Sequence, residues 1–560
     1  MGQKKDTSAT SSQAIPSDFH ASTAEPSTPS WPNNSTPSES ADSFGRVSIE
    51  DELPNYVGGA HWAAILENIA GLKDSLGSDE WPKVITHAPT FRKEYAEFWA
   101  NPNSKSISWI GFLFAIICLA VHFELKTGDV PISALSSMAV RDTEQRIGLY
   151  REKTVQCLIT SNYTEPGLYT VETLVLYYLS EHFQSKDALF GSWMLLGMII
   201  RAGMRLGIHR DASHYPNISI FRGEMQRRLW AAITLLDVQT SCQVGLPRMI
   251  SERMYDTKPP NHLLDEDLDE NMVVLPPVRP ENVLSPISHA LSKYRLLIVF
   301  GKIFDASNSI APIPYDEVMK LENLLFDTME KVPKSFRVTS IQGLDNGPVM
   351  SRVRRFSIEM AYLKARCFLH RKFLSEAKPL QKHSYSVKAC VDSSMLILQY
   401  QSYMTSETAL GRSLHGMKWI TSSLMTYDFL LAATLLCLYL GQMLAAEEQS
   451  TNTNHQDFPI EWTKENILCA LLKSYHIWNN PENSSEDTMK FSKVLKAMLN
   501  KVGYWSTASK TQMEAAKEIT SEDNSGHPSS YSIPNAYSLP QNNFEESPGD
   551  SSTSNIGSLG

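Results

Sequence analysis

Two neighbouring stretches, LLGMIIRAGMRLGIHRD (195–211) and FRGEMQRRLWAAITLLDVQTSCQVGLPRMI (221–250), decide the fold class of this 560-residue chain. Apolar residues around the first stretch recur at steps of three and four, which places them on one helix face; they are Leu189, Trp193, Leu196, Ile200 and Met204. The second stretch repeats the pattern at Met225, Leu229, Ala232, Leu236 and Thr240. We therefore predict two consecutive helices, the first capped by Gly207 and the second ended by the turn at Gly245 and Pro247.

Helical periodicity extends over most of the remaining chain. A further face is defined by Phe356, Met360, Leu363, Cys367 and Leu374. No sustained two-residue alternation bounded by hairpin turns occurs, which argues against a sheet. We predict an all-α fold, an irregular multi-helix array over residues 51–505.

Two apolar runs, 107–123 and 429–446, need to be tested as membrane spans. Ser108 and His122 interrupt the first, and Thr434 and Gln442 interrupt the second. Both are at or below the roughly 20 residues that a spanning helix requires. We predict buried core helices and no membrane association.

Both ends of the chain have the composition of disordered segments. Of the 38 residues 6–43, 21 are Ser, Thr or Pro, and residues 521–560 contain five acidic residues and no Lys or Arg. Such segments bury too little apolar surface to offset the entropy lost on folding. We predict disorder over 1–50, a linker-like segment, and over the acidic tail 506–560.

Charge and cysteine usage restrict the function classes. The formal net charge is −10, and an acidic chain binds nucleic acid poorly because binding depends on Lys and Arg neutralising phosphates. The seven cysteines form no C-x-x-C pair, which argues against a compact zinc site and a disulfide framework. We expect a reducing compartment, with no metal and no cofactor.

Enzyme signatures are missing from the sequence. His209-Arg210-Asp211 matches the start of a kinase catalytic loop, but the metal-binding Asn expected five positions after the Asp is Pro216 here. No nucleophile elbow, phosphate-binding glycine loop or H-E-x-x-H motif is present. We predict a charged turn at 209–211 and no catalytic residues.

A basic run lies on the helix predicted around residue 360. It offers two interpretations, an electrostatic contact surface for a nucleic acid or acidic partner and a solvated helix face opposite the apolar stripe. Aromatic interleaving is lacking, so we favour the solvated face. Its members are Arg352, Arg354, Arg355, Lys364, Arg366, Arg371 and Lys372, with Glu359 as the single acid.

The ordered combination of motifs at 195–211, 221–250 and 256–268 resembles the central block of the regulatory (middle homology) domain of fungal zinc-cluster transcription factors. The resemblance rests on L-G-x-H-R-D at a helix end, an acid before a basic pair and Leu-Trp, Leu-Asp at the next helix end, and a G-x-P turn. The matching residues are His209, Arg210, Asp211, Glu224, Arg227, Arg228, Trp230, Asp237, Gly245 and Pro247, with Asn261 and Asp265 beyond them. We expect all of them to be structural, with Arg227 or Arg228 pairing with acids such as Asp211 or Glu224, and Trp230 anchoring one helix to the next.

The resemblance implies a nuclear transcription regulator of a pathway-specific gene set, such as a metabolic gene cluster, that works as a dimer. That family carries an N-terminal cluster of six cysteines which binds zinc and DNA, whereas no cysteine precedes Cys118 here. We therefore expect action through protein partners, as a homodimer or as a heterodimer with a zinc-cluster factor. Two alternatives stay open: a gene model that lacks its first exon, and a helical small-molecule-binding protein or enzyme.

Overall fold

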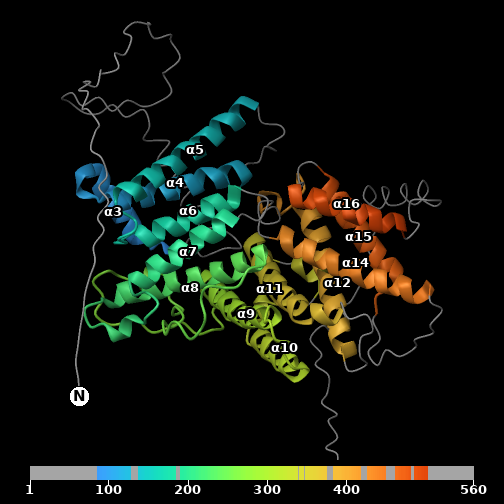
Figure 1. Cartoon of the computed structure of the whole chain (residues 1–560). Coiled ribbons are helices and arrows are strands. Elements are labelled where there is room, and N and C mark those ends of the chain that lie inside the picture. Colours follow the sequence, from blue (N-terminus) through green and yellow to red (C-terminus); the bar gives the residue numbers. More distant parts are fainter. Residues whose placement is uncertain are drawn as a thin grey trace, which may run out of the picture. The chain divides into compact units, whose positions relative to one another are not determined.

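Helices account for the regular secondary structure that the computed structural model describes (Figure 1). The described residues are 85–127, 137–184, 190–338, 340–345, 347–374, 383–417, 425–448, 461–480 and 485–501, and no strand occurs in these ranges. The predicted all-α class is therefore confirmed. The α-helices are α3 (Ala88–Ala100), α4 (Ile107–Thr127), α5 (Ser137–Thr160), α6 (Thr170–Gln184), α7 (Phe190–Arg205), α8 (Ile220–Val244), α9 (Pro286–Ser307), α10 (Tyr315–Glu330), α11 (Val349–Leu374), α12 (Ser384–Glu407), α14 (Thr426–Glu448), α15 (Lys464–Asn479) and α16 (Glu486–Lys501).

Helices that follow one another in the chain pack against one another. Helix α4 packs on α5 and α6, α6 on α7, α7 on α8, and α8 on α9. The series continues from α9 to α10 and α11, from α11 to α12, from α12 to α14 and α15, and from α15 to α16. Sequential elements are usually neighbours in space, and each buries its apolar face on the next. The irregular multi-helix array is confirmed.

The two helices predicted first are present as α7 and α8. In α7, Leu196 and Ile200 are buried, while Leu189 lies outside the described residues. Gly207 has a φ of 77°, and the amide of Ile208 donates to the carbonyl of Gly203, so the left-handed glycine closes the helix as predicted. Helix α8 begins after Ser219, whose hydroxyl accepts from the amide of Arg222, and ends at Gly245 with a φ of 70°.

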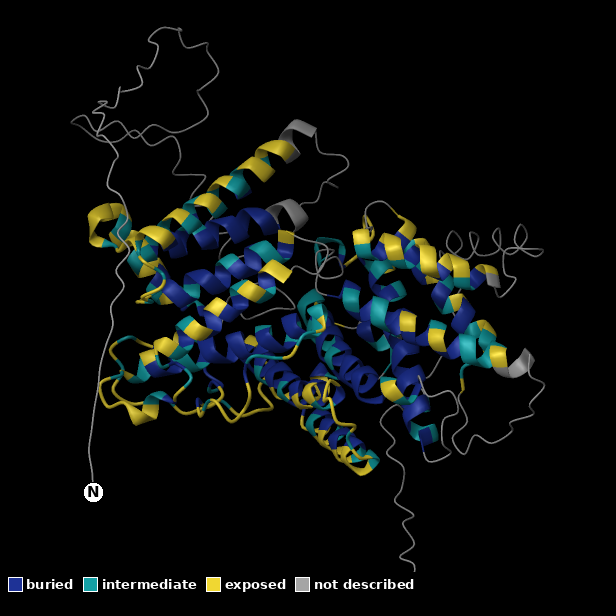
Figure 2. Ribbon diagram, viewed as in Figure 1, coloured by how far each residue is buried: buried dark blue, intermediate teal, exposed yellow. Residues whose placement is uncertain are grey.

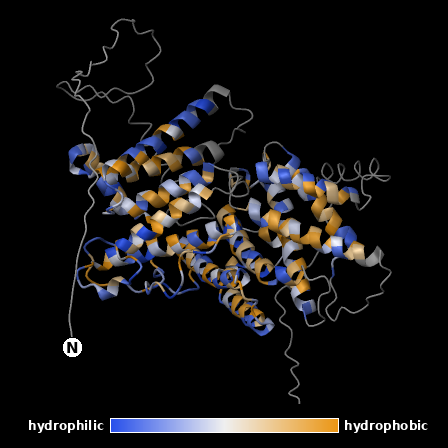
Figure 3. Ribbon diagram, in the orientation of Figure 1, coloured by the Kyte–Doolittle hydropathy of each residue, from blue (hydrophilic) through white to orange (hydrophobic). Residues whose placement is uncertain are grey.

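Burial of α8 differs from the single apolar face that we predicted. Much of α8 is coloured as buried in Figure 2, and its buried residues include the charged Glu224, Arg228 and Asp237. Helix α5 is the contrasting case, because it is largely exposed in Figure 2 and hydrophilic in Figure 3. The buried residues of α8 are Gly223, Glu224, Arg228, Leu229, Trp230, Ala231, Ala232, Ile233, Thr234, Leu235, Asp237, Val238, Thr240 and Ser241.

The two apolar runs form α4 and α14. Helix α4 is buried along nearly all of its apolar run, from Trp109 to Phe123. Among the described helices, α14 is long and apolar enough to cross a membrane over Thr426–Ala445, by length and composition. A core helix has the same composition, and α14 packs against α11, α12, α15 and α16 with Phe429, Leu436 and Leu440 buried. These contacts favour the core helix.

All described residues belong to one compact unit, residues 63–560. The predicted disordered segments 1–50 and 506–560 lie outside the described residues, as do the first 34 positions of the predicted domain 51–505.

Candidate functional site

Helix α8 carries half of the ten motif residues, and the burial of its charged side chains Glu224, Arg228 and Asp237 requires that each be neutralised inside the protein. A buried charge without a partner costs several kcal/mol of folding free energy. Five residues neutralise one another by forming ion pairs, and we call them the ionic core. They are Asp211, Glu224, Arg227, Arg228 and Asp265.

Arg228 lies at the centre of the ionic core and is 0% exposed. Its Nη1 donates to Oδ1 of Asp265 at 2.8 Å, and its Nη2 donates to the carbonyl of Leu263 at 2.8 Å. Glu224, the partner that helical spacing suggested, is farther away, with Oε1 at 3.9 Å from the Arg228 Nε. The main partner therefore comes from the loop after α8.

Glu224 is also fully buried, and the same loop supplies its hydrogen bonds. Its carboxylate accepts from the backbone amide of Asn261 at 2.8 Å and from the side-chain amide of Asn261 at 2.7 Å. Burial raises the pKa of Glu224, and the hydrogen bonds from Asn261 and the charges of Arg228 and Arg227 oppose that rise. Glu224 thus fastens residue 261 to α8.

Asp211 forms the second ion pair of the core. Arg227 donates from Nε and Nη2 to both carboxylate oxygens of Asp211, each at 2.9 Å. Asp211 also accepts from the amide of Lys258 at 3.0 Å and from the amide of Ser213 at 3.1 Å. The hydrogen bonds from Arg227 hold the pKa of this buried carboxyl well below its usual range, against the opposing effect of burial. Bidentate arginine pairs of this kind fix geometry as well as charge.

His209, Arg210 and Trp230 lie at the edge of the ionic core. Arg210 donates to the carboxylate of Asp256 at 3.1 Å, at the surface, and Asp256 accepts from the amide of Asp211 at 2.9 Å. The indole of Trp230 is buried between the rings of His209 and Tyr255, with centroid distances of 6.1 and 5.7 Å. The motif at 209–211 is therefore a charged turn that joins α7 to the loop after α8.

Asp237, Gly245 and Pro247 lie at the other end of α8. The carboxylate of Asp237 accepts from the amides of Met249 and Ile250, at 3.0 and 2.8 Å, and so folds the chain back after the exposed turn at 245–247. Burial raises the pKa of Asp237, and these two amides oppose the rise. The structure therefore brings four of the ten motif residues into one cluster, namely Asp211, Glu224, Arg227 and Arg228. It places Asp237, Gly245 and Pro247 together at a separate turn.

A substitution at Gly245 tests whether α8 ends in a left-handed turn that only glycine adopts without strain. Replacing Gly245 with alanine is expected to lower the free energy of unfolding by about 1–2 kcal/mol, because an L-residue is strained in the left-handed region. An added Cβ would meet no atom within 4 Å, so the backbone alone causes the loss. Gly148 in the middle of α5 also has open space, and Gly148→Ala should instead stabilise by about 0.5–1 kcal/mol. Chemical denaturation of both variants measures the difference, and equal effects would contradict it.

A second buried cluster lies between α10, α11 and α12, and the sequence analysis missed it. Glu322 of α10 accepts from Nε of Arg366 at 2.9 Å and from the hydroxyl of Tyr385 at 2.9 Å, and the ring nitrogen Nε2 of His370 lies 3.3 Å from it. Burial raises the pKa of Glu322, but Arg366 and His370 outweigh burial and lower it to about 2. The only local signal was the i,i+4 placement of Arg366 and His370.

The predicted solvated face on α11 is wrong. Three of its basic side chains are buried and paired with acids far away in sequence. Arg352 binds Glu407 at 3.1 Å, Lys364 binds Asp428 at 2.6 Å, and Arg366 binds Glu322. Arg354, Arg355 and Arg371 are half-buried, and Lys372 is exposed. The run is therefore not a single solvated face, because three of its seven charges hold helices together.

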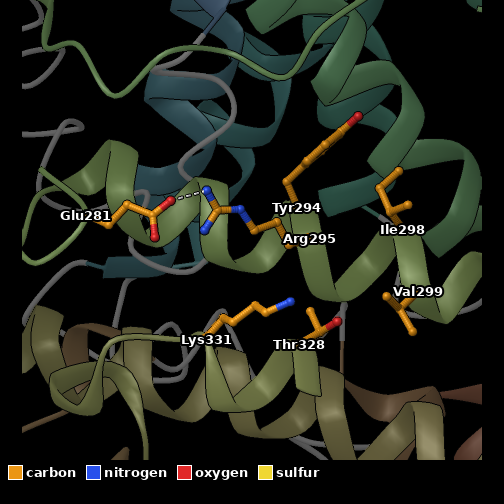
Figure 4. A pocket seen from close by; sticks show the side chains of 7 residues that line it. All are labelled: Glu281, Tyr294, Arg295, Ile298, Val299, Thr328 and Lys331. Carbon is orange, nitrogen blue, oxygen red and sulfur yellow. Dashed lines mark hydrogen bonds and ion pairs between the residues drawn. The ribbon is translucent and has the colours of Figure 1, made fainter. Parts of the chain in front are cut away.

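The structure also contains hollows. One, of about 440 Å³, lies between α9 and α10 and is shown in Figure 4. Arg295 and Glu281 form an ion pair at its rim, and both side chains are substantially exposed to water. Its lining residues are Glu281, Tyr294, Arg295, Ile298, Val299, Thr328 and Lys331. No acid–base pair or nucleophile converges in it.

The ionic core leaves Nε of Arg228 buried without a hydrogen-bond partner. Its carboxylates are bound by arginines and amides, which leaves no base or nucleophile poised for reaction. Within the described ranges, no group of three or more His, Cys, Asp or Glu side chains could hold a metal ion. The arrangement suits a rigid scaffold that fixes the loop 251–285 against α8.

Known proteins are similar to this chain over most of its length. Residues 82–320 match the family described as the fungal specific transcription factor domain. The chain is 35% identical to the Zn(2)-C6 fungal-type transcription factor mpsB of Macrophomina phaseolina over 82% of this chain and 68% of mpsB. It is 34% identical to the Zn(2)-C6 fungal-type transcription factor pigI of Monascus ruber, over 80% of this chain and 61% of pigI. It is also 31% identical to the equisetin cluster transcription factor eqxF of Fusarium heterosporum, over 82% of this chain and 73% of eqxF. No solved structure matches the chain.

Proposed function

Since this chain belongs to the family of Zn(2)-C6 fungal-type transcription factors and is a transcription regulator rather than an enzyme, we propose that it controls a pathway-specific gene set of secondary metabolism from the nucleus, together with protein partners. The proposal that the gene set belongs to secondary metabolism rests on the similarity to eqxF over four fifths of the chain, because that relative is named for a metabolite cluster. The relatives named for the fusarisetin A and pyrrolocin clusters point the same way.

Support for a protein partner comes from the exposed face of α7. Phe190, Met194 and Met198 follow one another at steps of four and are 64%, 64% and 40% exposed. Residues at this spacing share one helix face. Phenylalanine and methionine are enriched at protein interfaces. We assign this face, the α7 stripe, to a second helical domain of the same family, in a homodimer or a heterodimer.

We assign DNA contact to a zinc cluster, in a partner or in the same protein, and not to the described helices. The buried basic residues of α11 are used in internal ion pairs, and the chain is acidic overall. Duplex binding needs lysine and arginine side chains that are free to neutralise phosphates.

Deleting the gene and then reintroducing variants of it tests both the regulation of the gene set and the partner surface on α7. Deletion should change the transcript levels of one co-regulated gene set, and the wild-type gene should restore them. A double variant, Met194→Glu with Met198→Glu, should not restore them although the protein accumulates normally, because charge on the α7 stripe prevents association. Met489→Glu on α16, where the side chain is 49% exposed, is the matched control and should restore them.

The outcomes distinguish a failure of the regulatory function from a failure of the α7 partner surface. A transcriptome that deletion leaves unchanged would refute the regulatory function. Full restoration by the α7 double variant would leave regulation standing and refute the partner surface.

A further inference from the structure

A cavity of about 370 Å³ lies between α3, α4, the start of α6 and the first turns of α8. Its volume is at the lower end of the range of small-molecule sites, roughly 300–1,000 Å³. Aromatic and aliphatic side chains form its walls, among them Phe91, Phe112, Phe221 and Leu229. The cavity can therefore hold the apolar part of a small ligand.

Three carboxylates line the same cavity, and two of them are already bound. Glu94 accepts from the hydroxyl of Tyr169 at 2.6 Å and from the indole N–H of Trp109 at 2.9 Å. Glu270 binds the ammonium of Lys93 at 3.0 Å. Glu172, in the first turn of α6, forms no ion pair within the described part of the chain, and the charge of Arg222 is the opposite charge that acts on it.

The side chain of Glu172 is half-buried at the cavity wall. Burial raises its pKa, and its own amide and the charge of Arg222 only partly oppose the rise. Since Lys93 pairs with Glu270, the carboxylates of Glu94 and Glu172 remain in the cavity wall against one lining arginine, Arg222. A cationic group beside Glu172 would remove the imbalance, whereas an anionic ligand would increase it.

Tyr169 adds a conformational observation at the cavity wall. It is not glycine, yet its φ is 67°, in the left-handed region that costs an L-residue energy. Its ring stacks on Phe112 with a centroid distance of 5.2 Å, and its hydroxyl is held by Glu94. A strained residue that is fixed by two contacts presents a rigid aromatic surface to whatever occupies the cavity.

We propose that this cavity binds a small molecule that carries a protonated amine and an apolar or aromatic body, with the ammonium against the Glu172 carboxylate and the body against Phe112, Tyr169 and Phe221. Ammonium groups are attracted both to carboxylates and to the faces of aromatic rings. A bare metal ion is a poorer occupant, because no metal-binding group is present in the described part of the chain.

The site is connected to the ionic core. The ring of His87, in the cavity wall, bonds through Nε2 to the carbonyl of Asp265 at 2.9 Å, and the amide of Ala88 donates to the Asp265 carboxylate at 3.0 Å. Asp265 in turn binds Arg228. An occupant of the cavity therefore contacts the element that is tied to α8. Binding itself does not depend on the proposed regulatory function.

The test measures binding of 2-phenylethylamine to the purified full chain by calorimetry at neutral pH, with 2-phenylethanol and phenylacetate as a neutral and an anionic probe of similar size. The amine should bind saturably, and the alcohol should bind about tenfold or more weakly, because it lacks the charge that pairs with Glu172. Phenylacetate should not bind.

Glu172→Gln should reduce amine affinity by about tenfold or more while it leaves alcohol affinity unchanged. Glu97→Gln is the matched control, because Glu97 is on α3 outside the cavity and pairs with Lys105, and it should bind the amine as the wild type does. Equal binding of amine and alcohol, an unchanged affinity in Glu172→Gln, or no saturable amine binding at millimolar concentration would each overturn the proposal. The alcohol comparison on the wild type needs no variant, so misfolding of Glu172→Gln cannot mask the result.

Discussion

Replacing Arg228 with methionine is expected to lower the free energy of unfolding by about 3–5 kcal/mol, the range found when one partner of a buried ion pair is removed. Arg228 is 0% exposed and binds Asp265 and the carbonyl of Leu263. Methionine fills similar space, so the loss comes from removing the guanidinium that neutralises Glu224 and Asp265 and donates to the carbonyl of Leu263. Urea denaturation followed by circular dichroism measures it.

Arg210→Met is the matched control for this variant. Arg210 belongs to the same motif and also pairs with an aspartate, but its side chain is half exposed, and exposed ion pairs contribute little. A double variant, Arg228→Met with Glu224→Gln, should recover part of the loss, because glutamine carries no unpaired charge. If Arg228→Met and Arg210→Met destabilised equally, the ionic core would not be the feature that holds the loop to α8.

The helices could be predicted from the sequence because their signals are local. Apolar steps of three and four located α7 and α8, and Gly207 and Gly245 marked their ends, since a helix closes where the chain can adopt the left-handed conformation. These signals involve residues within one or two turns of each other. The motif at 209–211 was likewise recognisable as a turn after a helix end.

The pairing of Arg227 with Asp211 was expected from the motif and is observed, but the partners of Arg228 and of the α11 charges could not be predicted, because they lie far away in sequence. Helical spacing offered Glu224 to Arg228, whereas the shorter ion pair is with Asp265, 37 positions later. The same reasoning placed the α11 charges in solvent, while their partners come from α10, α12 and α14. A periodic pattern shows which residues share a face and does not show what packs on the opposite face.

The cavity lined by Glu172 was missed for a related reason. Its walls come from segments between residues 85 and 270, and no two of its carboxylates are neighbours in the sequence. The one local anomaly, the left-handed φ of Tyr169, is a property of the backbone that an ordinary tyrosine in the sequence does not reveal.

Replacing Glu322 with leucine should be as damaging as Arg228→Met, at about 3–5 kcal/mol, because it removes the carboxylate that binds the buried guanidinium of Arg366. Leucine is close to glutamate in volume and has high helix propensity, so α10 itself should persist. Urea denaturation at neutral pH measures the loss. Glu317→Leu is the matched control, since Glu317 is on the same helix, half exposed, and pairs only with Lys320.

The pH dependence of that loss separates the ion pairs from simple packing. The pKa of Glu322 is lowered to about 2 in the folded protein, from an ordinary value of 4.5. A lowered carboxyl pKa contributes stability that is complete above the unfolded pKa and is lost as the pH falls through the folded pKa. The difference between wild type and Glu322→Leu should therefore be constant above about pH 5 and should narrow from pH 4.5 toward pH 2, while the difference for Glu317→Leu stays small throughout. A Glu322→Leu loss that did not change with pH would mean that side-chain volume, and not charge, holds α10 to α11.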